Sequence, residues 1–206
     1  MSNSILSDPL WHRIEPLLPK PQRRNFQHAG RKPTDPRKVM TGIIFVLQTG
    51  VPWKSLPATS DFPSGHTCRR RLLEWQRRGV WKRLWQSLLA ELQSQGQLDW
   101  QRAVVDSSSV RAGHGGEKPG KNPVDRSKLG SKHHLLVEGQ GVPLAMSLTG
   151  ANRHDSTQLL RLVESIPKVQ GKRGRPRQKP KKRQGDRAYD SEPHWRALKK
   201  KGSSRS

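Results

Sequence analysis

The spacing of apolar residues changes near Trp100, and this change sets the kind of fold that the chain can adopt. Before it, apolar residues recur every three or four positions, which places them on one face of a helix. The clearest run is Trp81, Leu84, Trp85, Leu88, Leu89 and Leu92. After it, short apolar runs of strand type occur at 103–105 and 134–137. The pattern predicts an α+β chain, with an all-α domain over residues 1–98 and an α/β domain over residues 99–206.

Four helices are predicted in the first domain, over about residues 8–18, 36–49, 64–78 and 81–95. The second of them shows the signals most clearly. Asp35 is a typical N-terminal cap of a helix, Pro36 suits its first turn, and Gly50 is a typical residue at a helix end. Four helices of this size make a small bundle.

The third predicted helix has a basic side formed by Arg69, Arg70 and Arg71, and an apolar side formed by Leu72 and Trp75. In a helix-turn-helix unit, a basic helix lies against the DNA duplex. The alternative is a helical domain whose arginines only face water. Both interpretations stay open, and the three arginines are candidate DNA-binding residues.

The second domain is predicted to contain strand, strand, strand, helix, strand and helix, in that order. Residues 112–131 are rich in glycine, proline and charge, which is typical of a loop, and residues 138–141 form a turn between two strands. Asp155 is expected to cap the helix that follows it. A last helix is expected from Ser191 towards Lys201.

A large excess of basic residues favours a nucleic-acid partner. Lys and Arg number 40 against 16 Asp and Glu, which gives a formal net charge of +24. Such an imbalance destabilises a compact state unless a polyanion neutralises it, and basic side chains displace counterions from phosphates. Charge alone also allows a basic RNA-binding protein or a merely solvated surface.

The basic residues are densest at 172–183, where eight of twelve residues are Lys or Arg and none is acidic. This stretch resembles a short arm that reads the minor groove of A·T-rich DNA, and general contact with phosphates is the favoured alternative. Its candidate DNA-binding residues are Lys172, Arg173, Arg175, Arg177, Lys181, Lys182 and Arg183.

Membrane and secretory features are missing from the sequence. No apolar run approaches the ~20 residues of a membrane span, and the first residues lack the charged and apolar regions of a signal peptide. Cys68 is the single cysteine, so no internal disulfide can form. We therefore expect a cytoplasmic, nucleoid-associated protein with no membrane partner.

Two aspartates are candidate metal ligands. Asp106 ends an apolar strand, and Asp186 follows the basic stretch. A carboxylate at the end of a central strand points into the crevice where ligands bind, and Mg²⁺ is usually held by one or two carboxylates plus substrate phosphates. An ordinary turn or cap at Asp-Ser-Ser-Ser would explain Asp106 equally well.

Long motifs resemble the insertion-sequence-five family of transposases, within the larger DDE group. Residues 103–165 contain AVVDSSSV, HHLLVEGQGVPL and GANRHDS, and residues 173–191 read RGRPRQKPKKRQGDRAYDS. The N-terminal part contributes WHRIEPLLP and GRKPTDPRKVMTGIIFVLQTGVPWKSLP. The resemblance runs from about Ser7 to Gly202.

The resemblance implies an RNase H-like catalytic domain in which two aspartates and a glutamate hold Mg²⁺ or Mn²⁺. Asp106 matches the first aspartate and Asp186 the second, while the family's glutamate lies on a helix well past the second. Glu192 stands too close to Asp186, and Glu138 and Glu164 precede it. We therefore expect an incomplete catalytic domain, truncated before the third acid and inactive alone.

The resemblance also implies a function. The family binds the terminal inverted repeats of a bacterial transposable element, cuts there by metal-assisted hydrolysis, and joins the freed 3′-hydroxyl to target DNA. The implied partner is double-stranded DNA, and a homodimer is one assembly open to the chain. The alternative is a non-catalytic DNA-binding product that occupies the ends and represses transposition.

Overall fold

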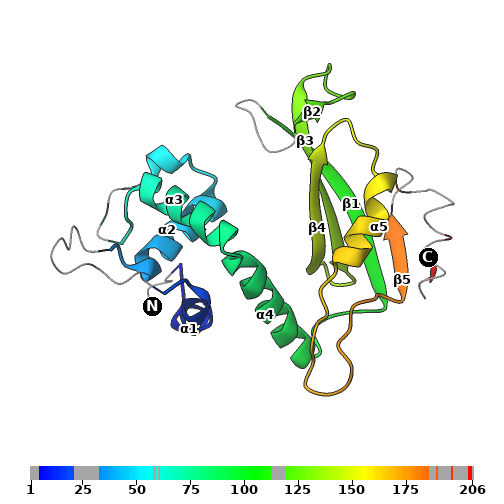
Figure 1. Cartoon of the computed structure of the whole chain (residues 1–206), viewed down its shortest axis with the longest axis horizontal. Helices are drawn as coiled ribbons and strands as arrows, with labels where there is room; N and C mark the ends of the chain where they lie inside the picture. Colours follow the sequence, from blue (N-terminus) through cyan, green and yellow to red (C-terminus); the bar gives the residue numbers. More distant parts are fainter. Residues whose placement is uncertain are drawn as a thin grey trace. The chain divides into compact units, whose positions relative to one another are not determined.

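Figure 1 shows the computed structural model of the chain, which describes residues 5–20, 33–57, 59, 61–112, 119–185, 189, 196 and 204–205. The chain divides into two compact units, Met1–Leu88 and Leu89–Ser206, and the division falls inside helix α4 (Val80–Ser94). The first unit is helical, and the second holds a mixed sheet and a helix, which confirms the predicted α+β class.

The helices of the first unit follow the sequence prediction closely. α1 (Asp8–Ile14) continues into a 3-10 turn, η1 (Glu15–Leu17), and is followed by α2 (Pro36–Thr49) and α3 (Gly65–Arg77). Another 3-10 turn among the described residues, η3 (Trp53–Ser55), is not foreseen from the apolar spacing because it is too short to show a period.

α2 begins and ends where its terminal residues require. The Asp35 side chain accepts a hydrogen bond from the Arg37 N–H at 2.9 Å, and Pro36 occupies a first-turn position where no N–H is needed. At the other end Gly50 adopts φ 70°, and its N–H bonds to the Val46 carbonyl. This left-handed cap favours glycine, which confirms the predicted stop.

The core of the first unit is an apolar cluster drawn from its helices and the segments beside them. Cys68 is fully buried within it, and a Cβ added at Gly42 would lie 2.8 Å from the Cys68 Sγ, so α2 and α3 pack closely there. The buried members are Leu6, Trp11, Ile14, Val39, Met40, Ile43, Val46, Leu56, Cys68, Trp75 and Val80.

The second unit is built on a six-stranded sheet. Its strands are β1 (Arg102–Arg111), β2 (Gly120–Lys121), β3 (Leu129–Glu138), β4 (Pro143–Gly150), β5 (Lys182–Gly185) and β6 (Ser204–Arg205). The order is β2-β3-β1-β5-β6, and β4 also pairs with β3. β1 runs antiparallel to β3 and parallel to β5, so it lies inside the sheet.

β1 is longer than predicted. The apolar run ends at Val105, but the strand continues to Arg111 because β3 supplies an antiparallel partner for every residue from Ala103 to Arg111. Asp106 therefore lies within the strand and not at its end. The prediction of a strand end at Asp106 is wrong, since the hydrogen bonds to β3 extend the strand where the side chains turn polar.

The predicted turn between β3 and β4 is confirmed, and a buried carboxylate holds it. Glu138 is 1% exposed, and its side chain accepts hydrogen bonds from the backbone N–H groups of Asp99, Gln140 and Val142, at 2.5, 3.0 and 2.9 Å. Three donors compensate the loss of water around this carboxylate. Glu138 is therefore a structural residue.

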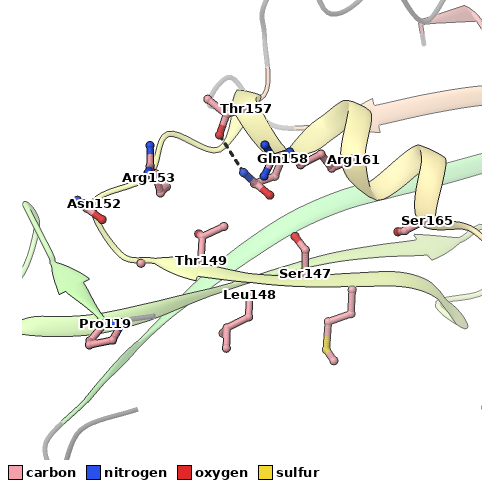
Figure 2. Close-up of a pocket in the computed structure, with 12 residues that line it drawn as sticks. Pro119, Ser147, Leu148, Thr149, Asn152, Arg153, Thr157, Gln158, Arg161 and Ser165 are labelled. Atoms are coloured by element: carbon pink, nitrogen blue, oxygen red, sulfur yellow. Dashed lines mark hydrogen bonds between the residues drawn. The ribbon is translucent and has the colours of Figure 1, made fainter. Parts of the chain in front are cut away.

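α5 (Ser156–Ser165) lies over one face of the sheet, above β4 (Figures 1 and 2). Leu159 and Leu162 are fully buried on its inner side, as are Leu136 and Leu144 in the strands. This helix was expected from the sequence. The helix expected from Ser191 towards Lys201 falls almost wholly outside the described residues.

Asp155 does not cap α5 with its side chain. Its backbone is already helical, at φ −63° and ψ −38°, and its side chain makes no capping hydrogen bond. The carboxylate instead pairs with Lys132 of β3 at 3.0 Å. The predicted N-cap role is therefore wrong, because an ion pair to the sheet takes the carboxylate away from the helix end.

None of the helices in the described part of the chain combines the length and the apolar character that crossing a membrane requires.

Candidate functional site

Asp106 presents its carboxylate on the face of the sheet that α5 does not cover. Side chains alternate along a strand, so Ala103 and Val105 point to the α5 side and are buried, while Asp106 points to the other side and is exposed. Its Oδ1 accepts a hydrogen bond from the Ser107 N–H at 2.7 Å. The carboxylate is fixed in direction and open to a ligand.

The second candidate aspartate, Asp186, lies outside the described residues. The residue before it, Gly185, ends β5 and pairs with Val105, which is the residue before Asp106. A Cβ added at Gly185 would lie 2.8 Å from Val105 Cγ1 and 3.1 Å from Tyr189 Cβ. The strand that leads to Asp186 thus runs directly beside the strand that carries Asp106.

No third acid completes a metal site among the residues that the structure describes, where no group of three or more His, Cys, Asp or Glu side chains is placed to hold an ion. Glu138 pairs with Ala103 and faces the α5 side, away from Asp106. Glu164 lies on α5 itself. The donor chemistry of Asp106 nevertheless suits Mg²⁺ or Mn²⁺, which prefer carboxylate oxygen and keep several waters.

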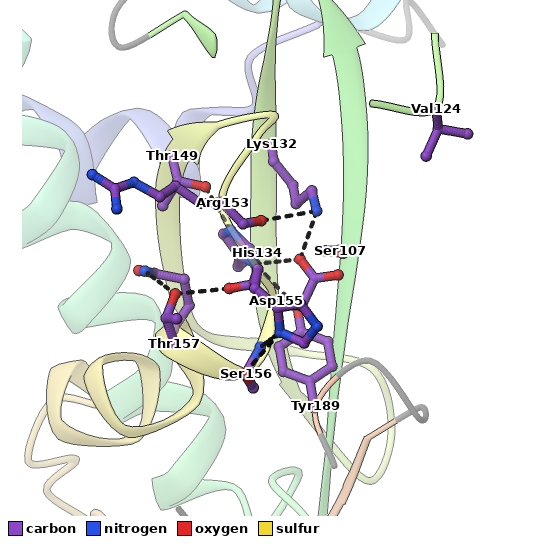
Figure 3. Close-up of polar contacts among 12 residues, drawn as sticks. Ser107, Val124, Lys132, His134, Thr149, Arg153, Asp155, Ser156, Thr157 and Tyr189 are labelled. Atoms are coloured by element: carbon purple, nitrogen blue, oxygen red, sulfur yellow. Dashed lines mark hydrogen bonds and ion pairs between the residues drawn. The ribbon is translucent and has the colours of Figure 1, made fainter. Parts of the chain in front are cut away.

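A buried polar network lies on the α5 side of the sheet, shown in Figure 3. His134 of β3 is fully buried, with Nδ1 3.1 Å from the Tyr189 hydroxyl and Nε2 2.8 Å from the Thr149 hydroxyl. A neutral imidazole donates from one nitrogen and accepts at the other, and a hydroxyl can take either part. Both ring nitrogens of His134 are therefore satisfied without a charge.

The same network includes one ion pair. Asp155 Oδ1 lies 3.0 Å from Lys132 Nζ and 3.6 Å from His134 Nδ1, and Lys132 Nζ also donates to the Arg153 carbonyl at 3.1 Å. These contacts join β3 to the segment before α5. Through Tyr189, His134 joins β3 to the segment that follows β5 as well.

Burial lowers the pKa of His134, and Lys132 and His133 lower it further, while Asp155 opposes them. In the unfolded chain the imidazole titrates at about 6.5. Because the folded pKa is lower, the unfolded state binds more protons below that value. We expect the second unit to hold its full stability above about pH 6.5 and to lose stability as the pH falls from there.

The measurement is the thermal midpoint of the full chain across that pH range. His134→Gln should flatten the pH dependence, since an amide pairs with both hydroxyls but does not titrate. His133→Gln changes the exposed neighbouring histidine and is the matched control. A pH dependence that survives in His134→Gln and disappears in His133→Gln would contradict the assignment.

The candidate DNA-binding arginines of α3 differ in their surroundings. Arg69 and Arg70 are exposed. Arg71 is partly buried and forms an ion pair with Glu74 at 2.6 Å, so part of its charge is already compensated. Contact of these residues with DNA stays a prediction.

The basic stretch 172–183 is exposed at six of its seven candidate residues. Arg183 is the exception, since it is 2% exposed and lies on the covered face of β5, opposite Ala103. Its Nε and one Nη have no hydrogen-bond partner in the described structure, and burial lowers its pKa to about 10. The prediction that Arg183 binds DNA is therefore wrong for this fold, because strand alternation turns it inward.

The link between His134 and Tyr189 is not predictable from local sequence patterns. The two residues are 55 positions apart, and neither lies in a spacing typical of a metal or catalytic motif. The one sequence feature that points to this link is the pair His133-His134 on a strand. Because side chains alternate between the two faces of a strand, one of these rings is exposed and the other is buried.

Comparisons with known proteins agree with the two units. Residues 6–85 match the family model described as "Putative transposase of IS4/5 family", and residues 101–205 match "Transposase DDE domain". The "Insertion element IS402 uncharacterized 16.2 kDa protein" of Burkholderia cepacia is 50% identical over 123 residues, which cover 60% of this chain and 84% of that protein.

A second relative from the same organism is the "Putative transposase for insertion sequence element IS402", which is 48% identical over 101 residues. That alignment covers 49% of this chain and 46% of the relative. No solved structure gives a significant match.

Proposed function

The chain belongs to the IS4/5 family of DDE transposases, and from this premise we propose that it binds the ends of an insertion element and contributes to metal-dependent phosphoryl transfer there. The observation that carries the proposal is the exposed carboxylate of Asp106 on the open face of the sheet, beside the strand that leads to Asp186. The predicted RNase H-like α/β domain is supported by the DDE match over residues 101–205.

In this proposal Asp106 and Asp186 hold Mg²⁺ or Mn²⁺ through carboxylate oxygens. The chemistry that a metal pair supplies at such carboxylates is activation of the attacking oxygen and stabilisation of the leaving one. The Ser107 N–H holds one oxygen of Asp106. The close packing of Gly185 against Val105 and Tyr189 holds the end of β5 against β1. These contacts fix the direction of the Asp106 carboxylate and the place of the last residue before Asp186, which supports the proposed pair.

DNA binding is assigned to both units. In the first, the exposed Arg69 and Arg70 of α3 would contact the duplex, and residues 1–98 would act as the DNA-binding domain. In the second, the exposed lysines and arginines between Lys172 and Lys182 would contact the backbone of the terminal inverted repeats or of target DNA. The high positive charge supports this assignment, since phosphate contacts supply most of the non-specific affinity for DNA.

A second candidate function is a non-catalytic DNA binder that occupies the ends and represses transposition. The observation that favours it is that no described acid joins Asp106 to form a three-carboxylate site. DNA binding through the exposed arginines would not need such a site.

One assay separates the two functions. A labelled duplex that carries the inverted repeats flanking the gene is incubated with the full chain, with Mg²⁺, with Mn²⁺, or with a chelator. A nick at the repeat end that needs the metal supports the transferase function. Retarded DNA that stays intact under all conditions supports the repressor function. A chain that neither retards nor nicks this duplex refutes both.

A further inference from the structure

A hollow of about 780 Å³ lies along β4 and α5, and Figure 2 shows the side chains around it. It is apart from Asp106, which projects from the opposite face of β1, with β3 standing between β1 and β4. The polar and basic side chains that line it are Ser147, Thr149, Asn152, Arg153, Thr157, Gln158, Arg161 and Ser165.

The lining of this β4–α5 groove is basic. It contains two exposed arginines, Arg153 before α5 and Arg161 on α5, and no acid among the described residues that line it. Of the two acids near it in the sequence, Asp155 pairs with Lys132 of β3, and Glu164 of α5 is not among the residues that line the groove. The side chains that line the groove therefore include two guanidinium groups and no carboxylate.

The backbone that carries Arg153 is held in place. Its N–H bonds to the Gly150 carbonyl at 3.0 Å, and its carbonyl accepts from Lys132 Nζ at 3.1 Å. Gly150 and Gly120 allow the Asn152 side chain to approach, since a Cβ at either glycine would lie under 3 Å from Asn152 Oδ1. A fixed backbone reduces the entropy lost when such a surface binds a ligand.

The edge of β4 adds backbone groups to the same surface. In the described part of the chain β4 pairs with β3 on one side only, so its outer edge keeps hydrogen-bonding groups that no strand takes up. Guanidinium groups, amides, hydroxyls and backbone N–H groups are the donors that proteins present to phosphate oxygens.

We propose that the β4–α5 groove binds the sugar-phosphate backbone of duplex DNA, as a contact surface separate from the Asp106 face. The inference rests on the proposed function, because it takes DNA as the partner of the chain. An acidic peptide is the rival occupant, but the net charge of +24 and the family membership both favour a long polyanion. The groove would hold DNA that flanks the reacting phosphodiester.

The test compares the salt dependence of duplex binding, by fluorescence anisotropy, for the unaltered chain and for Arg153→Ala/Arg161→Ala. Loss of two phosphate contacts should make the slope of log K against log salt shallower by about 1.8, at roughly 0.9 per contact. Both side chains are exposed, so folding should be retained, and Arg153→Lys/Arg161→Lys should keep most of the slope.

The matched control is Lys128→Ala/Lys168→Ala, which removes two exposed charges of the same unit outside the groove. An equal change of slope in this control, or an unchanged slope in the arginine variant, would overturn the groove assignment alone. If the arginine substitutions weaken the binding of poly-glutamate but leave the binding of DNA unchanged, the groove is assigned to an acidic peptide instead. Failure of the unaltered chain to bind duplex DNA at all would refute the proposed function together with the groove.

Discussion

The affinity of the full chain for duplex DNA should fall by about 10³–10⁵ between roughly 50 and 200 mM salt, as expected for a protein that makes about 6–10 phosphate contacts. The reason is that every phosphate neutralised by Lys or Arg releases condensed counterions, and added salt opposes this release. The net charge of +24 and the exposed residues of the 172–183 stretch provide the contacts. The measurement is a set of binding isotherms at increasing salt.

The triple change Arg173→Ala/Arg175→Ala/Arg177→Ala tests where part of this affinity arises. If these residues contact phosphates in general, binding to all sequences should weaken to a similar extent. A loss confined to A·T-rich duplexes would show instead that the stretch reads the minor groove. An isotherm that hardly moves with salt would rule out the electrostatic account of binding.

Asp106→Asn should remove most of the binding of Mn²⁺ to the chain while leaving DNA binding intact. The change keeps the shape of the side chain but deletes the charge that a hard cation requires. The loss of affinity should be at least the roughly 10–100-fold that is typical even of residues that only orient a metal ligand. The measurement is Mn²⁺ titration by electron paramagnetic resonance, with duplex binding measured in parallel in the presence of a chelator.

The matched control for this change is Asp61→Asn, which alters an exposed aspartate of the first unit. It should leave the Mn²⁺ titration unchanged. If Asp106→Asn binds Mn²⁺ as tightly as the unaltered chain, the metal site has been assigned to the wrong residue. If both variants lose affinity equally, the ion is held by general surface charge.

Several helix ends and one turn could be predicted from short stretches of sequence. The cap at Asp35, the stop at Gly50 and the turn at 138–141 follow from the conformations that single residues favour, and the structure confirms each of them. These features depend on neighbours a few positions away. They can therefore be read from a sequence without knowledge of the sheet.

The errors share one cause, which is that strand partners distant in sequence decide the outcome. The extension of β1 past Asp106 depends on β3, and the pairing of Asp155 with Lys132 depends on where β3 runs. The burial of Arg183 depends on the register of β5 against β1. Local sequence patterns do not show which strands pair. Arg183 was therefore expected on the surface because the residues around it in the sequence are basic.

The candidate site was foreseen only in part. Asp106 was found from its strand and from the family motif, and the structure shows it exposed beside the strand leading to Asp186. The buried ring of His134 and the groove beside Arg153 were not foreseen. His134 bonds to Thr149 of β4 and to Tyr189 after β5, and the groove combines β4 with α5, so both features depend on segments that are distant in the sequence.

The parallel pairing of β1 with β5 also has a consequence for the order in which the chain assembles. β3 and β4 meet through a short turn and can join early, whereas Arg102 must wait for Lys182, after the whole intervening chain has been made. Contacts of such long separation close slowly. We therefore expect β5, the strand that leads to Asp186, to join β1 later than the hairpin of β3 and β4 forms.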